Sequence, residues 1–331
     1  MPPVRHRYAF LDALRGFAVA GIIFVNIPDI TRLGWDGEEL PGPEAVLSVF
    51  HYFVSGRFVP IFVFLFGASM VFMRESARCR GCSPWAVLAR RLVALLAIGA
   101  LHQIAYPGEV LIMYAVAGLI MLPAIILIPG RLQLLGGLVA TVAVFTLKGG
   151  GLASIPTLML LGAGAVSCGW IEKLERGDKS VKVTAASALA ATVAGYWWQT
   201  TQPGDPRFTL AGGATGGIMA VLYITLLSLM WQTQAKGILQ ALFTPLGRAA
   251  FTCYLTATMI VVPVGKIFHF SVCGDLRVAV VLGAAILIAQ NIFMRFWFKR
   301  FTYGPLEYPW RAITWFGVPF RSAKNTEPLQ G

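Results

Sequence analysis

Three polar residues lie on the first long apolar segment, residues 10–30, which is otherwise typical of a membrane-spanning helix. Asp12 and Arg15 stand three residues apart, so they share a helix face and can pair, and Asn26 follows about three turns further along. Charged and amide groups are costly inside a bilayer, which makes them candidate functional groups. Arg15 either forms an interfacial ion pair with Asp12 or binds an anionic substrate group arriving from the cytoplasm. Asn26 either bonds to a neighbouring helix or takes part in function.

A histidine with a nearby carboxylate offers the chemistry of a general base. His102 follows the apolar run 92–101, and Glu109 comes seven residues later, across a tight turn that contains Tyr106. A carboxylate partner fixes the tautomer of the imidazole ring and raises its basicity. The alternative is a structural histidine bonded to a carbonyl group or to Tyr106. His51, in an aromatic stretch, is the rival base, or else an interfacial residue.

Several arginines are candidates for binding anionic groups. Arg90, Arg91 and Arg248 lie in segments expected on the cytoplasmic side, where they and Arg15 can meet phosphates, with Asp12 as the partner of Arg15. The alternative for Arg248 is a cytoplasmic anchor. We also count three residues expected near the outer side as candidate substrate-binding residues: Arg57, His51 and Tyr106. An arginine on the outer side departs from the positive-inside trend. We expect Arg57 to pair with Glu109 or with an acid of the first outer loop.

The composition predicts an all-α, polytopic membrane protein. Of the 331 residues, 57% are hydrophobic and only 13% are charged, whereas soluble domains have roughly 25% charged residues. Apolar stretches of spanning length predict about ten transmembrane helices. These are residues 10–30, 56–73, 86–106, 109–128, 132–148, 153–171, 182–201, 210–231, 245–268 and 277–298. Residues 44–57 are semi-polar, and we leave open whether they form a re-entrant or an interfacial piece.

The distribution of positive charge predicts the orientation. With the N-terminus in the cytoplasm, all but six of the 27 Lys and Arg residues fall in cytoplasmic segments, as the positive-inside rule demands. Both termini are then cytoplasmic, residues 1–298 form the helical bundle in the plasma (inner) membrane, and residues 299–331 form an interfacial segment and tail. The net charge of +12 is explained by this topology and by anionic lipids, so the bilayer is the expected partner and nucleic acid is not.

The cysteines do not indicate a metal site. Five are present, and Cys79 and Cys82 form a single CxxC pair, whereas a zinc site needs about four ligands. We therefore expect no metal. The sequence also lacks a GxSxG, Walker A or HExxH motif and any convincing repeat.

Several motifs, spread over nearly the whole chain, resemble those of the bacterial YeiB-like membrane proteins. They are Leu11-Asp12-Ala13-Leu14-Arg15-Gly16, Phe24-Val25-Asn26, Phe64-Leu65-Phe66-Gly67, Gly99-Ala100-Leu101-His102, Gly108-Glu109-Val110-Leu111 with Tyr114, Leu246-Gly247-Arg248 through Tyr254, and Gly304-Pro305-Leu306-Glu307 through Arg311. Members of that family often have Gly-Asp in place of Gly108-Glu109, which keeps the carboxylate, and Thr-Asn-Tyr in place of Thr252-Cys253-Tyr254, which loses an amide here.

The first two helices are also remotely similar to those of heparan-alpha-glucosaminide acetyltransferase and other transmembrane acyltransferases. The similarity implies transfer of an acyl group from cytoplasmic acyl-CoA, with acetyl-CoA favoured, to a hydroxyl or amine of a small-molecule or glycan acceptor on the outer side. The active histidine of that enzyme lies after the first helix, where this chain has none before His51, so His102 or His51 would serve. Asn26 would donate to the oxyanion.

The alternative function is a transporter or exporter that uses the same polar groups as a substrate path. A narrow tunnel from the cytoplasmic side to His102 would favour the enzyme, and a wide vestibule at the midplane would favour transport. The sequence leaves open the acceptor, the acyl length and whether the chain forms homo-oligomers.

Overall fold

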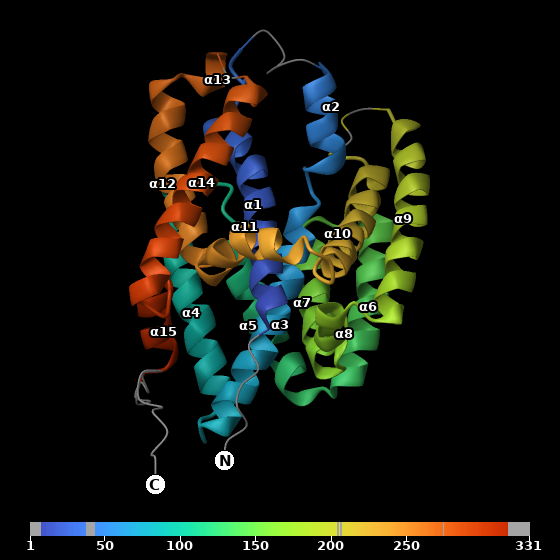
Figure 1. Cartoon of the computed structure of the whole chain (residues 1–331), viewed down its shortest axis with the longest axis vertical. Coiled ribbons are helices and arrows are strands. Elements are labelled where there is room, and N and C mark those ends of the chain that lie inside the picture. The colour runs from blue at the N-terminus through green and yellow to red at the C-terminus, as the bar shows by residue number, and fades with distance from the viewer. Residues whose placement is uncertain (1–7, 38–43, 204, 206, 274, 317–331) are drawn as a thin grey trace.

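The computed structural model describes residues 8–37, 44–203, 205, 207–273 and 275–316, and within these ranges the chain is helical and has no strand (Figure 1). The helices are α1 (Ala9–Thr31), α2 (Glu44–Phe53), α3 (Phe58–Cys79), α4 (Pro84–His102), α5 (Leu111–Leu127), α6 (Gly130–Lys148), the 3-10 helix η1 (Gly151–Ala153), α7 (Ser154–Ser167), α8 (Trp170–Arg176), α9 (Lys179–Thr200), α10 (Leu210–Met230), α11 (Lys236–Arg248), α12 (Ala250–Ile267), α13 (Phe270–Cys273), α14 (Leu276–Arg300) and α15 (Glu307–Thr314).

Seven helical segments of the described chain are long and apolar enough to cross a membrane, or eight if the bent pair α7–α8 is one span. A helix lies at each of the ten expected ranges, but the count of ten is not confirmed. Helix α5 has only 17 residues, and the α7–α8 pair bends by 75°. Helix α9 is long enough, but alanines and polar ends lower its hydropathy. The expected cytoplasmic location of both termini is not confirmed, and residues 1–7 and 317–331 lie outside the described residues.

Residues 44–57 form a helical extension of the following span. Helix α2 and helix α3 together make one apolar segment of 36 residues, Glu44–Cys79, joined through a short turn. A helix of that length extends about 54 Å, well beyond the ~30 Å of a bilayer core. Helix α2 therefore projects beyond the spanning part of α3, as Figure 1 shows at the top of the molecule, and does not fold back as a re-entrant loop.

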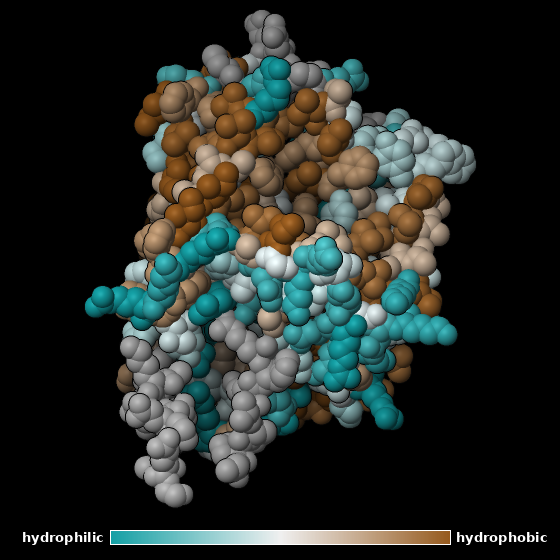
Figure 2. Space-filling model, viewed as in Figure 1, coloured by the Kyte–Doolittle hydropathy of each residue, from teal (hydrophilic) through white to brown (hydrophobic). Residues whose placement is uncertain are grey.

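Apolar side chains cover much of the molecular surface. Large residues such as Leu147 and Val139 on α6 are 77% and 68% exposed. Figure 2 shows apolar side chains over the upper part of the molecule, around α12 and α14, and a hydrophilic belt at and below the level of α11. An apolar surface of this extent suits contact with lipid rather than water.

Glycines let the central helices approach closely, as is common where membrane helices pack. Helix α11 runs across α1 instead of beside it (Figure 1). A Cβ atom on Gly247 of α11 would lie 1.7 Å from the carbonyl oxygen of Asp12, and one on Gly16 of α1 would lie 1.9 Å from the carbonyl oxygen of Phe243. Backbone therefore meets backbone at this crossing, and no side chain larger than hydrogen fits at either position.

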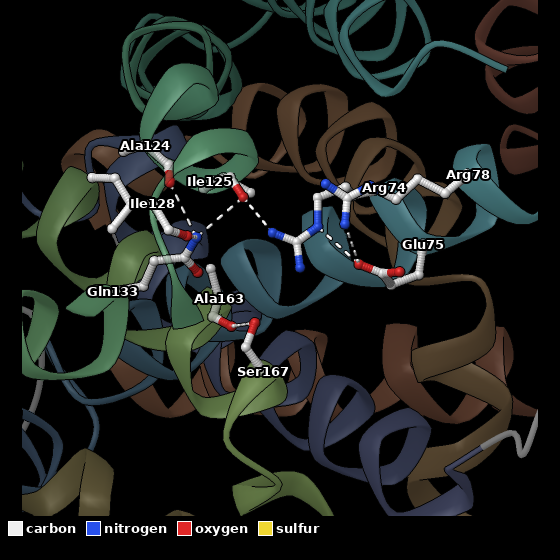
Figure 3. A network of polar contacts seen from close by, with 9 residues as sticks. All are labelled: Arg74, Glu75, Arg78, Ala124, Ile125, Ile128, Gln133, Ala163 and Ser167. Atoms are coloured by element: carbon white, nitrogen blue, oxygen red, sulfur yellow. Dashed lines mark hydrogen bonds and ion pairs between the residues drawn. The ribbon is translucent and has the colours of Figure 1, made fainter. Parts of the chain in front are cut away.

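A polar cluster closes the C-terminal end of α5 (Figure 3). Gln133 of α6 is completely buried, and its amide nitrogen donates to the carbonyl oxygens of Ala124, Ile125 and Ile128 at 3.0, 3.1 and 2.8 Å. Arg74 of α3 donates to the carbonyl oxygen of Ile125 at 2.5 Å. The last carbonyl groups of a helix have no partners within it, so this cluster satisfies them and ties α3, α5 and α6 together.

We expect Gly247→Ala to destabilise the protein because the added Cβ overlaps the α1 backbone and forces the two helices apart. Such overpacking costs about 1–3 kcal/mol, so the melting temperature in detergent should fall by several degrees. Gly237→Ala on the same helix is the matched control, because nothing lies within 4 Å of its Cβ position and alanine favours the helix. Equal melting temperatures for the two variants would contradict this account of the crossing.

Candidate functional site

A cavity of about 200 Å³ lies in the helical bundle, near the crossing of α1 and α11. Its walls come from α1, α3, α4, α5, α11, α12 and α15 and from Val110, which precedes α5. The polar and charged residues that line it are Arg15, Asn26, Ser69, Arg91, Tyr114, Arg248, Tyr254 and Glu307. The other lining residues are mostly aliphatic and aromatic, so the charges stand out against an apolar wall.

One stripe of α1 runs the length of the cavity. Arg15, Val19, Ile22 and Asn26 all line it, at positions i, i+4, i+7 and i+11 of one helix. Eleven residues make three turns with about 20° left over, so Arg15 and Asn26 share a face and stand about 16 Å apart along the axis. The cavity therefore has an arginine and an amide in its wall that are three turns of α1 apart.

Three of the four predicted arginines meet at the end of the cavity near α11 and α15: Arg15, Arg91 and Arg248. Arg15 pairs with Asp12 at 3.4 Å, as its spacing predicts. The fourth, Arg90, is exposed, does not line the cavity and donates to the carbonyl oxygen of Phe316. Since residues 90 and 91 differ by 100° around the helix, only one of them can face the cavity.

Aromatic rings hold two of these guanidinium groups. The guanidinium carbon of Arg91 lies 3.6 Å from the ring centre of Trp310 on α15, and the indole nitrogen of Trp310 donates to the carbonyl oxygen of Arg91 at 3.1 Å. The guanidinium carbon of Arg248 lies 3.8 Å from the ring centre of Phe298. Cation–π contacts stabilise the position of a guanidinium group. The contact of Arg91 docks α15 against α4 beside the cavity, and the contact of Arg248 ties α11 to α14.

Glu307 is a charged wall residue that the sequence reasoning did not assign to the site. Its carboxylate accepts from the backbone N–H groups of Phe251 and Thr252 at 2.9 and 3.1 Å and from the Thr252 hydroxyl at 2.5 Å. The carboxylate therefore caps the N-terminus of α12, whose first N–H groups have no partner within the helix. Residues 246–254 and 304–311 both belong to motifs that resemble those of YeiB-like proteins. Only the fold shows that these two segments contact each other.

The predicted pair of His102 and Glu109 is brought together and fully buried. The Nδ1 atom of His102 lies 3.7 Å from a carboxylate oxygen of Glu109. The carboxylate is engaged by the first turn of α5, accepting from the N–H groups of Leu111 and Ile112 at 2.7 and 2.9 Å. Neither ring nitrogen of His102 has a hydrogen-bond partner among the described residues, so its lone pair is not committed to a structural bond.

His102 is the neighbour of the cavity and not part of its wall. Its ring centre lies 5.3 Å from that of Tyr254, which lines the cavity beside Asn26 and Tyr114. His102 also stands eleven residues after Arg91 on α4, the spacing that separates Asn26 from Arg15 on α1. The histidine and the amide are therefore both about 16 Å from the arginine end along their helices.

Tyr106 lies beside His102, and its hydroxyl group points to α1. Its ring centre is 6.2 Å from that of His102, and its hydroxyl donates to the exposed Asp29 at 2.5 Å. Burial, and then the hydrogen bond to Asp29, raise the pKa of Tyr106 far above its usual value. Tyr106 therefore stays protonated and acts as a donor, and its partner is Asp29 instead of the alternative partner, His102.

Two of the three residues predicted to bind substrate, Arg57 and His51, lie away from the cavity. Arg57 is 1% exposed and donates to the carbonyl oxygen of Ser55 and to Gln199 of α9 at 3.3 Å. The expected pairing of Arg57 with Glu109 is wrong, because Glu109 caps α5 instead. His51 is half-buried on α2, with its ring against Phe50. Neither His51 nor Arg57 lines the cavity.

Comparison with known proteins places the chain in a family. Residues 165–317 match a family described as a protein of unknown function, DUF418. The "uncharacterized 39.9 kDa protein in amylase 3'region" of Bacillus acidopullulyticus is 32% identical over 335 residues, which cover 93% of this chain and 94% of the relative. The chain belongs to the DUF418 family. The "uncharacterized protein YxaH" of Bacillus subtilis (strain 168) is 26% identical over 387 residues, covering 93% of this chain and 94% of the relative.

The expected resemblance to YeiB-like proteins agrees with membership of the DUF418 family, because YeiB-like families carry this region. None of these comparisons shows a similarity to acyltransferases. No solved structure matches the chain.

We expect Glu307→Ala to destabilise the protein, because three donors at the start of α12 lose their acceptor. Loss of a helix cap costs about 0.5–2 kcal/mol, and loss of the part-buried charge–dipole contact adds to this. Glu307→Gln keeps an acceptor oxygen and should lose less. Thermal unfolding in detergent measures both changes, and a glutamine variant as unstable as the alanine variant would show that the charge, and not the acceptor, matters.

Proposed function

We propose that this protein is a membrane-embedded acyltransferase that moves an acyl group from acyl-CoA to a hydroxyl or amine acceptor. The observation that carries the proposal is the layout of the cavity. Arg15, Arg91 and Arg248 stand at one end. An apolar stretch follows, and Asn26 lies at the other end with His102 just behind the wall.

The arginine end suits the phosphates of a coenzyme. Guanidinium groups bind phosphate through paired, charge-assisted hydrogen bonds, and the apolar wall suits a thin acyl-pantetheine arm. The distance of about 16 Å from Arg15 to Asn26 is comparable with the length of an extended phosphopantetheine arm. Phosphates held by the arginines would therefore place the thioester close to Asn26. Acetyl-CoA is the donor that best suits so small a cavity.

His102 is the proposed base. The nearby carboxylate of Glu109 favours the tautomer with its proton on Nδ1, which leaves Nε2 as an acceptor. Nε2 takes a proton from the acceptor hydroxyl or amine as that group attacks the thioester carbonyl. Asn26 donates to the developing oxyanion. The carbon–sulfur bond then breaks, and the coenzyme leaves as a thiol after taking the proton from His102. Tyr254 separates His102 from the cavity, so its side chain must shift for this step.

The location follows from the same proposal. We place the arginine end on the cytoplasmic side of the plasma membrane, where acyl-CoA is available, and the end with His102, Tyr106 and Asp29 toward the outer side. The acceptor, a small molecule or a glycan, would arrive from there. The positive-inside rule supports this direction.

A transporter is the second candidate, and the bent pair α7–α8, at 75°, is the feature that favours it, since transporters use broken helices at their binding sites. However, none of the residues that line the cavity comes from α8. The volume of about 200 Å³ is also small for a wide vestibule, although the cavity ends at Tyr254 and does not reach His102. The acyltransferase is therefore the better-supported proposal.

Binding of acetyl-CoA and longer acyl-CoAs to the purified protein tests the proposal, with thermal shift as the measurement and free CoA alongside. A ligand at 100 times its Kd stabilises a protein by about 2.7 kcal/mol. Arg91→Gln removes charge-assisted hydrogen bonds worth about 1.5–3 kcal/mol, so we expect the affinity to fall about tenfold or more. Arg90→Gln, its exposed neighbour outside the cavity, is the matched control and should bind like the wild type.

Two further variants separate binding from chemistry. Arg91→Gln also removes the contact with Trp310 and could weaken binding by disturbing the fold. Arg15→Gln leaves that contact intact and should still weaken acyl-CoA binding. His102→Ala should still bind acyl-CoA and should lose the transfer reaction once an acceptor is found. Absence of any shift with every acyl-CoA, or equal binding by the Arg90 and Arg91 variants, would overturn the proposal and favour transport.

A further inference from the structure

A second, open hollow of about 320 Å³ lies between α11 and α14, on the other side of Arg248 from the cavity. We call it the α11–α14 groove. It is lined by Gln240, Thr244, Pro245, Arg248, Arg295, Phe298 and Lys299. Three of these seven residues are cations and none is acidic, so the groove attracts an anion. It shares only Arg248 with the cavity.

The cations of the groove are held in place by the fold. Arg295 and Lys299 are exposed and stand four residues apart on one face of α14. Arg295 donates to the carbonyl oxygen of Ala241 on α11 at 2.5 Å, and Arg248 donates to the carbonyl oxygen of Thr302 at 3.3 Å. Both contacts use backbone oxygens, and no acidic residue is among those that line the groove.

An apolar stripe leads along α14 to these charges. Ile288, Ile292 and Phe296 follow at intervals of four residues and are 61%, 50% and 65% exposed, and residues at this spacing lie on one face of the helix. Arg295 and Lys299 come three residues after Ile292 and Phe296. The surface therefore changes from apolar to cationic within one turn, the order found where a helix leaves the hydrocarbon core for the headgroup layer.

Helix α11 also exposes apolar side chains beside the groove. Ile238 and Leu242, one turn apart, are 64% and 50% exposed. The helix lies across the bundle at the level of the hydrophilic belt in Figure 2, below the apolar upper surface. Apolar residues on both helices thus flank a groove whose polar side is positive.

We infer that the α11–α14 groove binds the headgroup of an anionic phospholipid, with the phosphate between Arg295, Lys299 and Arg248 and an acyl chain along Ile288, Ile292 and Phe296. The charges explain the preference for an anionic headgroup, and the stripe explains why the ligand is a lipid and not a free phosphate. Arg248 lines both the cavity and the groove, so a lipid phosphate bound in the groove would contact a side chain of the cavity wall. The inference does not depend on the proposed acyl transfer.

Titration of the detergent-purified protein with phosphatidylglycerol tests this, with phosphatidylcholine of the same acyl chains as the neutral lipid. Native mass spectrometry counts bound lipid, and thermal shift measures stabilisation. We expect phosphatidylglycerol to bind about tenfold or more tightly than phosphatidylcholine, since each surface cation contributes roughly 1 kcal/mol toward anionic lipid. Inorganic phosphate and glycerol 3-phosphate should not compete at concentrations similar to that of the lipid.

Arg295→Gln with Lys299→Gln should remove most of the preference for phosphatidylglycerol, and Arg248 is left unchanged because it also lines the cavity. Arg176→Gln with Lys179→Gln, two exposed cations near α8 and α9, is the matched control and should keep the preference. The lipid-free melting temperature of each variant reports its folding. Equal binding of the two lipids by the wild type, an unchanged preference in the Arg295 and Lys299 variant, or competition by inorganic phosphate would overturn the inference.

Discussion

The contact between α1 and α11 determines where the charged residues of this protein meet. Backbone carbonyl groups of one helix occupy the space where the other helix would carry a Cβ atom, at Gly16 and at Gly247. The short helix α11 can therefore lie directly across α1. Arg248, the residue after Gly247, comes to the cavity wall beside Arg15 for this reason, and it also lines the groove that α11 forms with α14. A wider crossing would separate the cavity from the groove.

Two carboxylates, the buried Glu109 and the half-buried Glu307, cap helices at opposite ends of the site. Glu109 caps α5 and Glu307 caps α12, and in each case a charge that is costly to bury meets helix N–H groups that lack partners. Each glutamate also lies next to a group of interest, Glu109 beside His102 and Glu307 in the cavity wall. The helix ends thus supply hydrogen-bond donors to carboxylates within an apolar bundle.

The sequence predicted local relations well and distant ones poorly. The pairing of Asp12 with Arg15 and the nearness of His102 to Glu109 follow from spacings of three and seven residues, which leave the chain little freedom. The role of Glu307 could not be predicted, because its partners on α12 lie more than fifty residues away in the sequence. Arg57 illustrates the same limit, since its partner Gln199 is 142 residues away.

The predicted count of ten spans is not confirmed, for a different reason. Hydropathy locates apolar stretches, and a helix is present at each of the ten, but it does not show which of them run straight and are long enough to cross a bilayer. A bend such as the one between α7 and α8 depends on tertiary packing. The sequence also could not show which of two adjacent arginines, Arg90 or Arg91, faces inward, because that depends on which side of α4 packs against the bundle.

The balance of charge in the cavity has a physical consequence. Arg15, Arg91 and Arg248 line one small, mostly apolar space, and two nearby carboxylates are engaged, Asp12 with Arg15 and Glu307 with the start of α12. Like charges in a medium of low dielectric constant repel one another strongly. Cation–π contacts at Arg91 and Arg248 offset part of this cost. An anion bound among these residues would offset more of this cost, because it would interact favourably with several cations at once, and this is the physical basis of the proposed anionic ligand.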